Sequence, residues 1–187
     1  METIYYCIKF FNDGGAFMYP ILLVMAVGLA IAMERWLKLN NSMRRNRRTW
    51  DEIQPVLQEG DFDQARELTA KSDTELGMVL SLGLSRQGSV RRRDDIEIAM
   101  EEGMMEIIPQ LEKRTPYLAI LANVATLLGL LGTIVGLIQA FTAVANANPS
   151  EKANLLSNAI AVAMNTTAFG LIAGIPLLMM HSFLTAK

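Results

Sequence analysis

Residues 126–136 read TLLGLLGTIVG, and residues 165–176 read NTTAFGLIAGIP. Both stretches set glycine and threonine among large apolar residues, and neither contains a charge. They lie inside uncharged runs at residues 115–150 and 153–186, and a third such run covers residues 14–33. About twenty helical residues, at about 1.5 Å each, cross the roughly 30 Å hydrocarbon core of a bilayer. The sequence therefore predicts an all-α integral membrane protein with three transmembrane helices.

The composition excludes several classes of protein. Of the 187 residues, 51% are hydrophobic, and a soluble globular protein would interrupt such long apolar runs with charged faces. A formal net charge of −2 gives no field that would attract nucleic acid. Cys7 is the only cysteine, so an intrachain disulfide framework and a cysteine-based metal site are excluded. No basic stretch and cleavage site precede the first span, so we expect that span to be retained.

Changes in polarity divide the chain into segments. The hairpin between the second and third spans contains Pro149, Glu151 and Lys152. In the polar middle, the pattern predicts a helix around Trp50, and Pro109 is expected to bend a helix that continues into the second span. We expect transmembrane helices at residues 14–39, 117–145 and 155–184, a helical region at 40–116, a hairpin at 146–154, and ends at 1–13 and 185–187.

Positive charge indicates how the chain is oriented. The stretch from Arg35 to Arg114 holds 14 of the 17 lysines and arginines. Cytoplasmic loops of membrane proteins carry such an excess, so this region is expected to be cytoplasmic. The N-terminus and the hairpin are then periplasmic, and the C-terminus is cytoplasmic. The basic runs are expected to contact lipid head groups.

Small residues share one face on each of the last two spans. At 100° per residue, Thr126, Gly129, Gly136 and Ala140 fall within about 60° of Thr133. On the third span, Ala163, Thr167, Gly170 and Gly174 share a face. Such faces serve either close helix packing or a polar surface that lines an ion path or holds a partner helix. The helix-packing candidates are Gly129, Gly132, Gly136, Gly170, Gly174 and Pro176, and Pro176 is expected to bend its helix.

Other polar residues of the spans point to assembly rather than catalysis. Asn158 and Asn165 lie about 160–180° from Thr167. Amides in lipid need partners, so we expect these two at a subunit boundary of a homo-oligomer. The spans contain no carboxylate at mid-depth, no HExxH motif and no Ser/His/Asp arrangement. The protein is therefore expected not to be an enzyme and to need no cofactor or metal.

Several stretches resemble the MotA/TolQ/ExbB proton-channel family, most closely its ExbB-like branch. The resemblance rests on YLAILANVATLLGLLGTIVGLIQAF and AIAVAMNTTAFGLIAGIP in the last two spans. It extends to ERWLKL at the end of the first span, to GDFDQARELTAKS, and to IIPQLEKRTPYLA. Together these stretches cover nearly the whole chain.

The resemblance implies a pentameric motor subunit in a bacterial inner membrane. The pentamer would surround single-span partner helices of the ExbD/TolR type, whose Asp titrates. Ion movement would drive work that reaches outer-membrane receptors through a TonB-like protein. The family's pore threonines correspond to Thr133 and Thr167, and Thr126 and Thr166 are further pore-lining candidates.

The chain also departs from the family pattern. Enterobacterial ExbB and TolQ sequences carry a Glu in the third span where this chain has Val162. The chain ends at Lys187, just past the third span, where family members commonly extend that helix. Within the family, a TolQ-like envelope motor or a flagellar-type stator is the alternative function. A passive membrane scaffold is the alternative outside the family, and a secondary transporter is disfavoured because the sequence shows no internal repeat.

Overall fold

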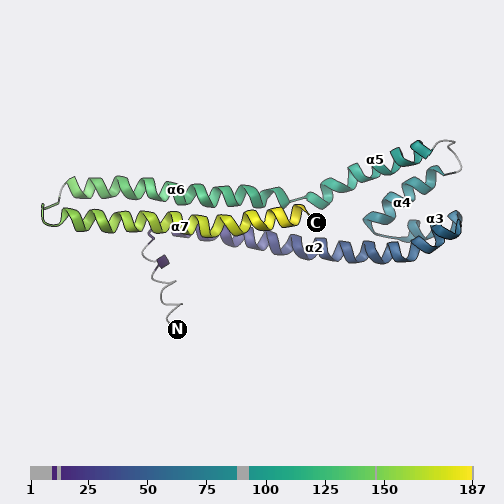
Figure 1. Ribbon diagram of the computed structural model, residues 1–187, viewed down its shortest axis with the longest axis horizontal. Helices are drawn as coiled ribbons and strands as arrows, with labels where there is room; N and C mark the ends of the chain where they lie inside the picture. Colours follow the sequence, from purple (N-terminus) through teal and green to yellow (C-terminus); the bar gives the residue numbers. More distant parts are fainter. Residues whose placement is uncertain (1–9, 12–13, 88–92, 146, 187) are drawn as a thin grey trace, which may run out of the picture. The chain divides into compact units, whose positions relative to one another are not determined.

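The computed structural model describes residues 10–11, 14–87, 93–145 and 147–186, and Cys7 lies outside them. Within this part of the chain the protein is all-α, and Figure 1 shows the labelled helices. They are α2 (Met18–Glu59), α3 (Phe62–Lys71), α4 (Glu75–Arg86), α5 (Arg93–Glu112), α6 (Thr115–Ala145) and α7 (Lys152–Thr185). The chain divides into two compact units: the first is Met1–Met33 with Arg114–Lys187, and the second is Glu34–Lys113.

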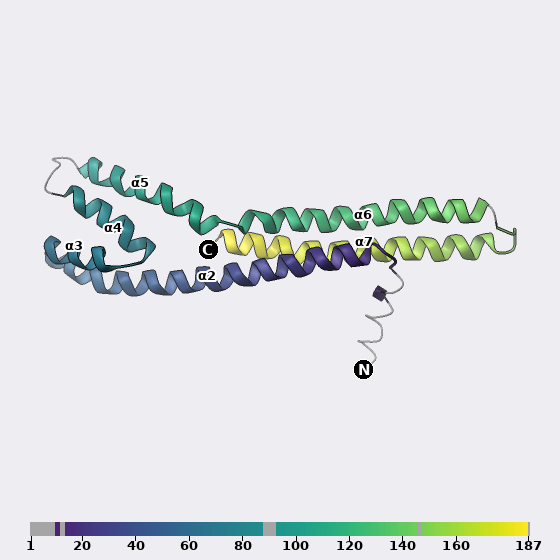
Figure 2. The same cartoon turned by 180° about the vertical axis from the view of Figure 1, so that it is seen from behind.

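In the first unit, α6 and α7 form an antiparallel pair along nearly their full length, and the start of α2 lies beside α7 (Figures 1 and 2). Ile21, Ala125 and Ala173, one from each helix, form a core that is at most 1% exposed. Leu177 of α7 is fully buried and contacts α2 at Gly28, where an added Cβ would lie 2.7 Å from its methyl groups.

In the described part of the chain, three helical stretches are long and apolar enough to cross a membrane: Met18–Glu59, Arg93–Ala145 and Lys152–Thr185. Many large apolar side chains of these helices face outward, such as Ile138 and Phe141 of α6 and Met179 of α7, each at least 60% exposed. Such side chains need lipid or other apolar surfaces around them. The chain is therefore a membrane protein with three transmembrane helices.

Helix α2 is longer than the sequence pattern indicated. It does not end near Leu39 but continues to Glu59, so the stretch around Trp50 is part of α2 and not a separate helix. Pro55 lies inside this helix, where it removes a single backbone donor close to the helix end. Ile53, which is 1% exposed, anchors this final stretch in the second unit.

The junction between α5 and α6 also differs from the expectation. Pro109 lies inside α5, and the helix continues past it to Glu112. The chain instead breaks at Arg114, whose φ of 71° lies in the left-handed region and stops helical hydrogen bonding. Thr115 and Pro116 then begin α6, a position where proline's missing N–H costs nothing.

The second unit contains short helices with side-chain caps. Asp61 caps α3 by accepting a 3.0 Å hydrogen bond from the Gln64 amide. Thr74 caps α4 by accepting from the Gly77 amide at 3.2 Å. Ala65 and Val79 are buried between the helices.

Candidate functional site

The small-residue faces of α6 and α7 meet each other within a single chain. A Cβ added to Gly170 would lie 2.8 Å from the Ala125 carbonyl oxygen and 3.0 Å from the Cα of Gly129. A Cβ on Gly129 would lie 3.1 Å from the Cα of Gly170. The two helix backbones are therefore in direct contact, which only glycine permits on both sides.

This close contact extends along the interface in both directions. A Cβ on Gly174 would lie 2.5 Å from Thr126 Oγ1, and one on Gly136 would lie 3.2 Å from the Cβ of Ala163. Gly132 makes room for the Cγ2 of Thr166, which would lie 2.4 Å from an added Cβ. The residues named as helix-packing candidates on α6 thus all face α7.

Thr133 and Thr167 lie together at this interface. The Thr167 hydroxyl donates to the carbonyl of Gly129 across the interface at 3.1 Å, and its Oγ1 lies 3.4 Å from Thr133 Oγ1. Thr133 donates to the carbonyl of Leu130 in its own helix at 2.5 Å. Both threonines are half-buried, so the pair lies at the edge of the interface. Each hydroxyl oxygen can accept two hydrogen bonds, so the pair can solvate a proton-bearing group that approaches from outside the chain.

The other two candidate pore threonines do not join this pair. Thr126 donates to the carbonyl of Ala122 in its own helix at 3.1 Å. Thr166 is only 2% exposed and donates to the carbonyl of Gly14 at 2.7 Å, far from it in sequence. The structure thus separates Thr166 from its neighbour Thr167, because consecutive helical residues point about 100° apart.

The remaining predicted residues of α7 lie away from the threonine pair. Asn158 is exposed and Asn165 is half-buried. Val162 is 36% exposed and lies near Gly15, where an added Cβ would be 3.5 Å from its Cγ1. Pro176 is exposed and lies inside α7, which continues to Thr185.

Sequence reasoning missed the contacts of the segment that precedes α2. Phe10 and Phe11 pack edge-on against Phe169 of α7, with ring centroids 6.4 Å and 5.8 Å apart. Gly15 has a φ of 75°, a conformation that favours glycine, and it turns the chain into α2. The adjacent glycines at positions 14 and 15 were the signal for this turn, but nothing in the sequence indicated what the turn packs against.

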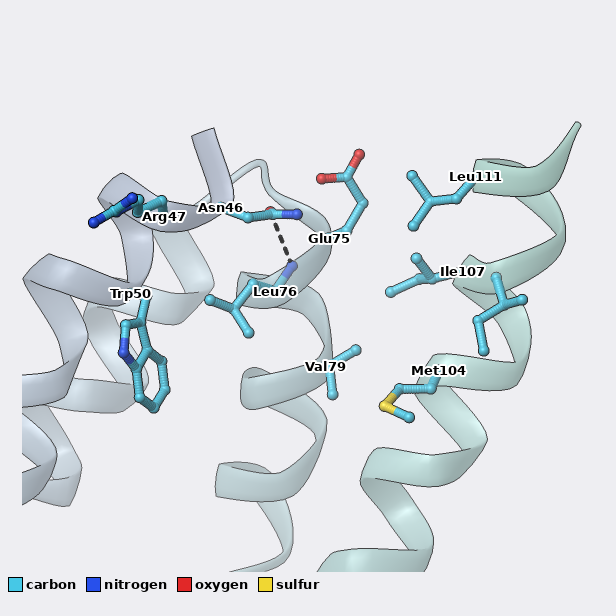
Figure 3. Close-up of a pocket in the computed structure, with 10 residues that line it drawn as sticks. Asn46, Arg47, Trp50, Glu75, Leu76, Val79, Met104, Ile107 and Leu111 are labelled. Carbon is cyan, nitrogen blue, oxygen red and sulfur yellow. Dashed lines mark hydrogen bonds between the residues drawn. The ribbon is translucent and has the colours of Figure 1, made fainter. Parts of the chain in front are cut away.

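The second unit contains a crevice of about 420 Å³ between α2, α4 and α5 (Figure 3). Figure 3 shows Met104, Ile107 and Leu111 of α5 opposite Leu76 and Val79 of α4. At its edge, Asn46 accepts a hydrogen bond from the Leu76 amide at 3.3 Å. The lining is mainly apolar, so the crevice offers a packing surface and not a constellation for acid–base chemistry. Among the residues described here, no group of three histidine, cysteine or acidic side chains could hold a metal ion.

Comparison with known proteins identifies relatives of the chain. Residues 71–187, which include α4 to α7 and the threonine pair, match the family model described as the MotA/TolQ/ExbB proton channel family. A Tol-Pal system protein TolQ from Haemophilus influenzae is 37% identical over 89 residues, which are 48% of this chain and 39% of that protein.

Two further relatives carry ExbB names. A protein of Methanothermobacter thermautotrophicus, named as a biopolymer transport protein ExbB homolog, is 26% identical over 186 residues, covering 96% of this chain and 63% of that protein. Biopolymer transport protein exbB1 of Vibrio cholerae is 44% identical over 59 residues, covering 32% and 26% respectively. The chain thus covers less than two thirds of the length of each of these three proteins.

Proposed function

The chain belongs to the MotA/TolQ/ExbB proton channel family, and from this we propose that it is the channel subunit of an ExbB-type motor in a bacterial inner membrane. In this proposal, ion movement through a homo-oligomer, with five copies expected, drives a TonB-like protein that energises outer-membrane transport. The N-terminus and the α6–α7 hairpin are periplasmic, and the second unit is cytoplasmic.

The observation that carries the proposal is the Thr133–Thr167 pair. The two hydroxyl oxygens are 3.4 Å apart, and both threonines are half-buried at the edge of the α6–α7 interface. Apart from Lys152 at the start of α7, these two helices contain no carboxylate, lysine or arginine. Such a pair can hydrogen-bond a titrating group but cannot itself take up and release a proton near neutral pH. The titrating group must then come from a partner, and a single-span ExbD/TolR-like helix with an Asp supplies it.

The outer surface of the first unit supports an oligomer. Asn158 is exposed on α7, and an amide in lipid needs a hydrogen-bond partner that a second subunit can supply. Exposed large apolar residues on α6, such as Leu127 and Ile134, provide surface for contact between helices. The four arginines between positions 44 and 48 are exposed and suit lipid head groups.

A TolQ-like envelope motor is the second candidate function. One observation favours it: the relative from Haemophilus influenzae carries a TolQ name and is 37% identical over about half of this chain. Both candidates use the same ion path and differ in the periplasmic protein that receives the work. Pull-down with a TonB-like and a TolA-like protein in parallel would separate them.

The test of the ion path uses Thr133→Val and Thr167→Val, which keep side-chain volume but remove the hydroxyl. We expect each to slow partner-dependent proton flux into proteoliposomes roughly 5–150-fold, the effect of leaving one polar group without its hydrogen bond in the barrier, about 1–3 kcal/mol. Native mass spectrometry should show unchanged assembly.

Thr142→Val is the matched control because it makes the same change in α6 at an exposed hydroxyl that donates to the Ile138 carbonyl of its own helix. This control should conduct normally. Normal flux in both Thr133→Val and Thr167→Val would contradict the proposal. Loss of assembly together with flux would assign the two residues to helix packing.

A further inference from the structure

Thr166 lies where three parts of the first unit meet. Its hydroxyl donates to the carbonyl of Gly14 at 2.7 Å, and its methyl group packs against Gly132 of α6. Phe17 closes the same site, since a Cβ on Gly132 would lie 3.3 Å from the Cβ of Phe17. Thr166 therefore connects α7 both to α6 and to the Gly14–Phe17 turn that precedes α2.

The hydrogen bond to Gly14 is the distinctive feature of this junction. Thr166 Oγ1 also lies 3.0 Å from the carbonyl of Val162, its own helix's i−4 acceptor, which every helical threonine can reach. The Gly14 carbonyl is closer, belongs to a buried residue, and lies outside any helix. A buried carbonyl strongly favours a state in which it is paired, so this bond holds the turn to α7.

We propose that Thr166 is a positioning residue that fixes the rotation of α7 and thereby holds the Thr167 hydroxyl against Gly129 and Thr133. This rests on the proposed function of the Thr133–Thr167 pair. Thr166 and Thr167 are consecutive on one helix, so a rotation that moved Thr166 away from Gly14 would turn Thr167 by the same angle. The turn before α2 thus sets the geometry of the ion path without contacting the ion.

Two substitutions separate the hydroxyl from the methyl group. Thr166→Val keeps the methyl against Gly132 and removes the donor to Gly14, whereas Thr166→Ser keeps the donor and removes the methyl. A spin label at the exposed Ala16, introduced as Ala16→Cys in a Cys7→Ser background, reports on the turn without depending on ion flux. Partner-dependent proton flux into proteoliposomes reports on the ion path.

We expect Thr166→Val to increase the mobility of the label and to reduce flux about tenfold or more, with unchanged assembly. Thr166→Ser should keep both the label and the flux close to those of the parent protein. An immobile label in Thr166→Val would overturn the inference, as would a serine variant that fails as badly as the valine variant. If the label becomes mobile while flux is normal, Thr166 holds the turn but does not position Thr167, and the inference is also wrong.

The proposed function is tested independently of this inference. If Thr133→Val and Thr167→Val conduct normally while Thr166→Val frees the label, the ion-path proposal fails and only the structural contact to Gly14 stands. If those two variants lose flux and Thr166→Val does not, the ion-path proposal stands and the positioning role fails.

Discussion

The helices within each of the two units pack by different kinds of contact. In the first unit, α6 and α7 contact each other at Gly129 and Gly170, which have no side chains. In the second unit, the helices are joined by side chains that reach backbone carbonyls, as where Arg66 of α3 donates to Leu84 of α4 at 2.9 Å. Lipid provides no hydrophobic drive for helix pairing, so close van der Waals packing must supply it. The short helices of the charged unit depend instead on caps and cross-helix hydrogen bonds.

Hydroxyl groups bond to one another in the second unit and mainly to backbone carbonyls in the first. In the second unit, Thr49, Ser72 and Thr74 form a closed set of side-chain hydrogen bonds at 2.8–3.3 Å. In the first unit, Thr126 and Thr133 donate to carbonyls of their own helix. Thr126 and Thr133 thus satisfy their donors within α6, as helical threonines can. The hydroxyls of Thr166 and Thr167 in the same unit instead bond to carbonyls outside their own helix.

The largest effect should come from adding bulk between α6 and α7. Gly170→Val places methyl groups against the Ala125 carbonyl, a backbone atom that cannot move aside. We expect the free energy of unfolding to fall by at least about 1–3 kcal/mol, the usual cost of overpacking. Little folded protein should then remain after extraction. Size-exclusion chromatography of the solubilised protein and thermal unfolding by circular dichroism measure this. Ile172→Val, two residues away and 57% exposed, is the control and should unfold like the parent.

A Gly170→Val variant that folds and melts normally would mean that the two helices do not touch in the membrane. In that case close backbone contact would not explain how α6 and α7 pair, and this difference between the units would disappear.

A smaller effect should come from removing one hydroxyl of the second unit. Thr74→Val removes the N-cap of α4 and a member of the Thr49–Ser72–Thr74 set, and should cost about 1–2 kcal/mol. Because the loss is local, hydrogen exchange of the first turn of α4, including the Gly77 amide, should speed up while α6 and α7 exchange as before. Ser81→Ala, which removes an exposed hydroxyl bonded within its own turn, should leave the exchange unchanged. Unchanged exchange in Thr74→Val would show that the Thr74 cap does not stabilise the first turn of α4.

The smallest effect concerns an exposed ion pair on α3. The Lys71 ammonium donates to the Glu67 carboxylate at 2.6 Å, and this hydrogen bond together with the positive charge lowers the pKa of Glu67 from its ordinary value of 4.5. A carboxylate with a depressed pKa stabilises the folded state above its unfolded-state pKa, and this contribution is lost as the pH falls below about 4.5 through the folded-state pKa.

Both side chains of this pair are about two thirds exposed, so solvent screens the interaction. We therefore expect Lys71→Gln to raise the pKa of Glu67 toward 4.5 without a measurable change in thermal unfolding. Carbon-13 NMR titration of the Glu67 carboxyl, at low and high salt, measures this shift. A pKa that does not respond to Lys71→Gln would contradict the pairing.

Helical periodicity was sufficient to place the small faces of the last two spans. The 100° turn put Thr133 with Gly129 and Gly136, and Thr167 with Gly170, and these residues do share faces that meet. Periodicity does not tell what covers a face, so the sequence left open whether the partner was another span or an ion path. The glycine faces of α6 and α7 cover each other because the two helix backbones come into contact. This contact is visible only in the folded chain.

Contacts between residues far apart in sequence determine features that could not be predicted from the sequence. Thr166 had the same residue type and neighbourhood as Thr167, and only its contact with Gly14, 152 positions earlier, assigns it a different place. The continuity of α2 from Leu39 to the stretch around Trp50 was missed because the apolar run ends there, and a change in hydropathy marks the membrane boundary but not the end of a helix. The break at Arg114 was missed because arginine rarely adopts a positive φ.

The contacts at Gly170 and Gly174 determine how α6 and α7 can move. Sliding α7 by one turn in one direction would bring Leu178 to the place of Gly174, where Thr126 Oγ1 and the Ala122 carbonyl leave no room for a Cβ. Sliding it in the other direction would bring Thr166 to the place of Gly170, against the Ala125 carbonyl. The pair therefore has one register and resists shear along its length. The helices α6 and α7 therefore move together as one rigid pair, and in the proposed motor any change of shape would come from contacts outside this pair.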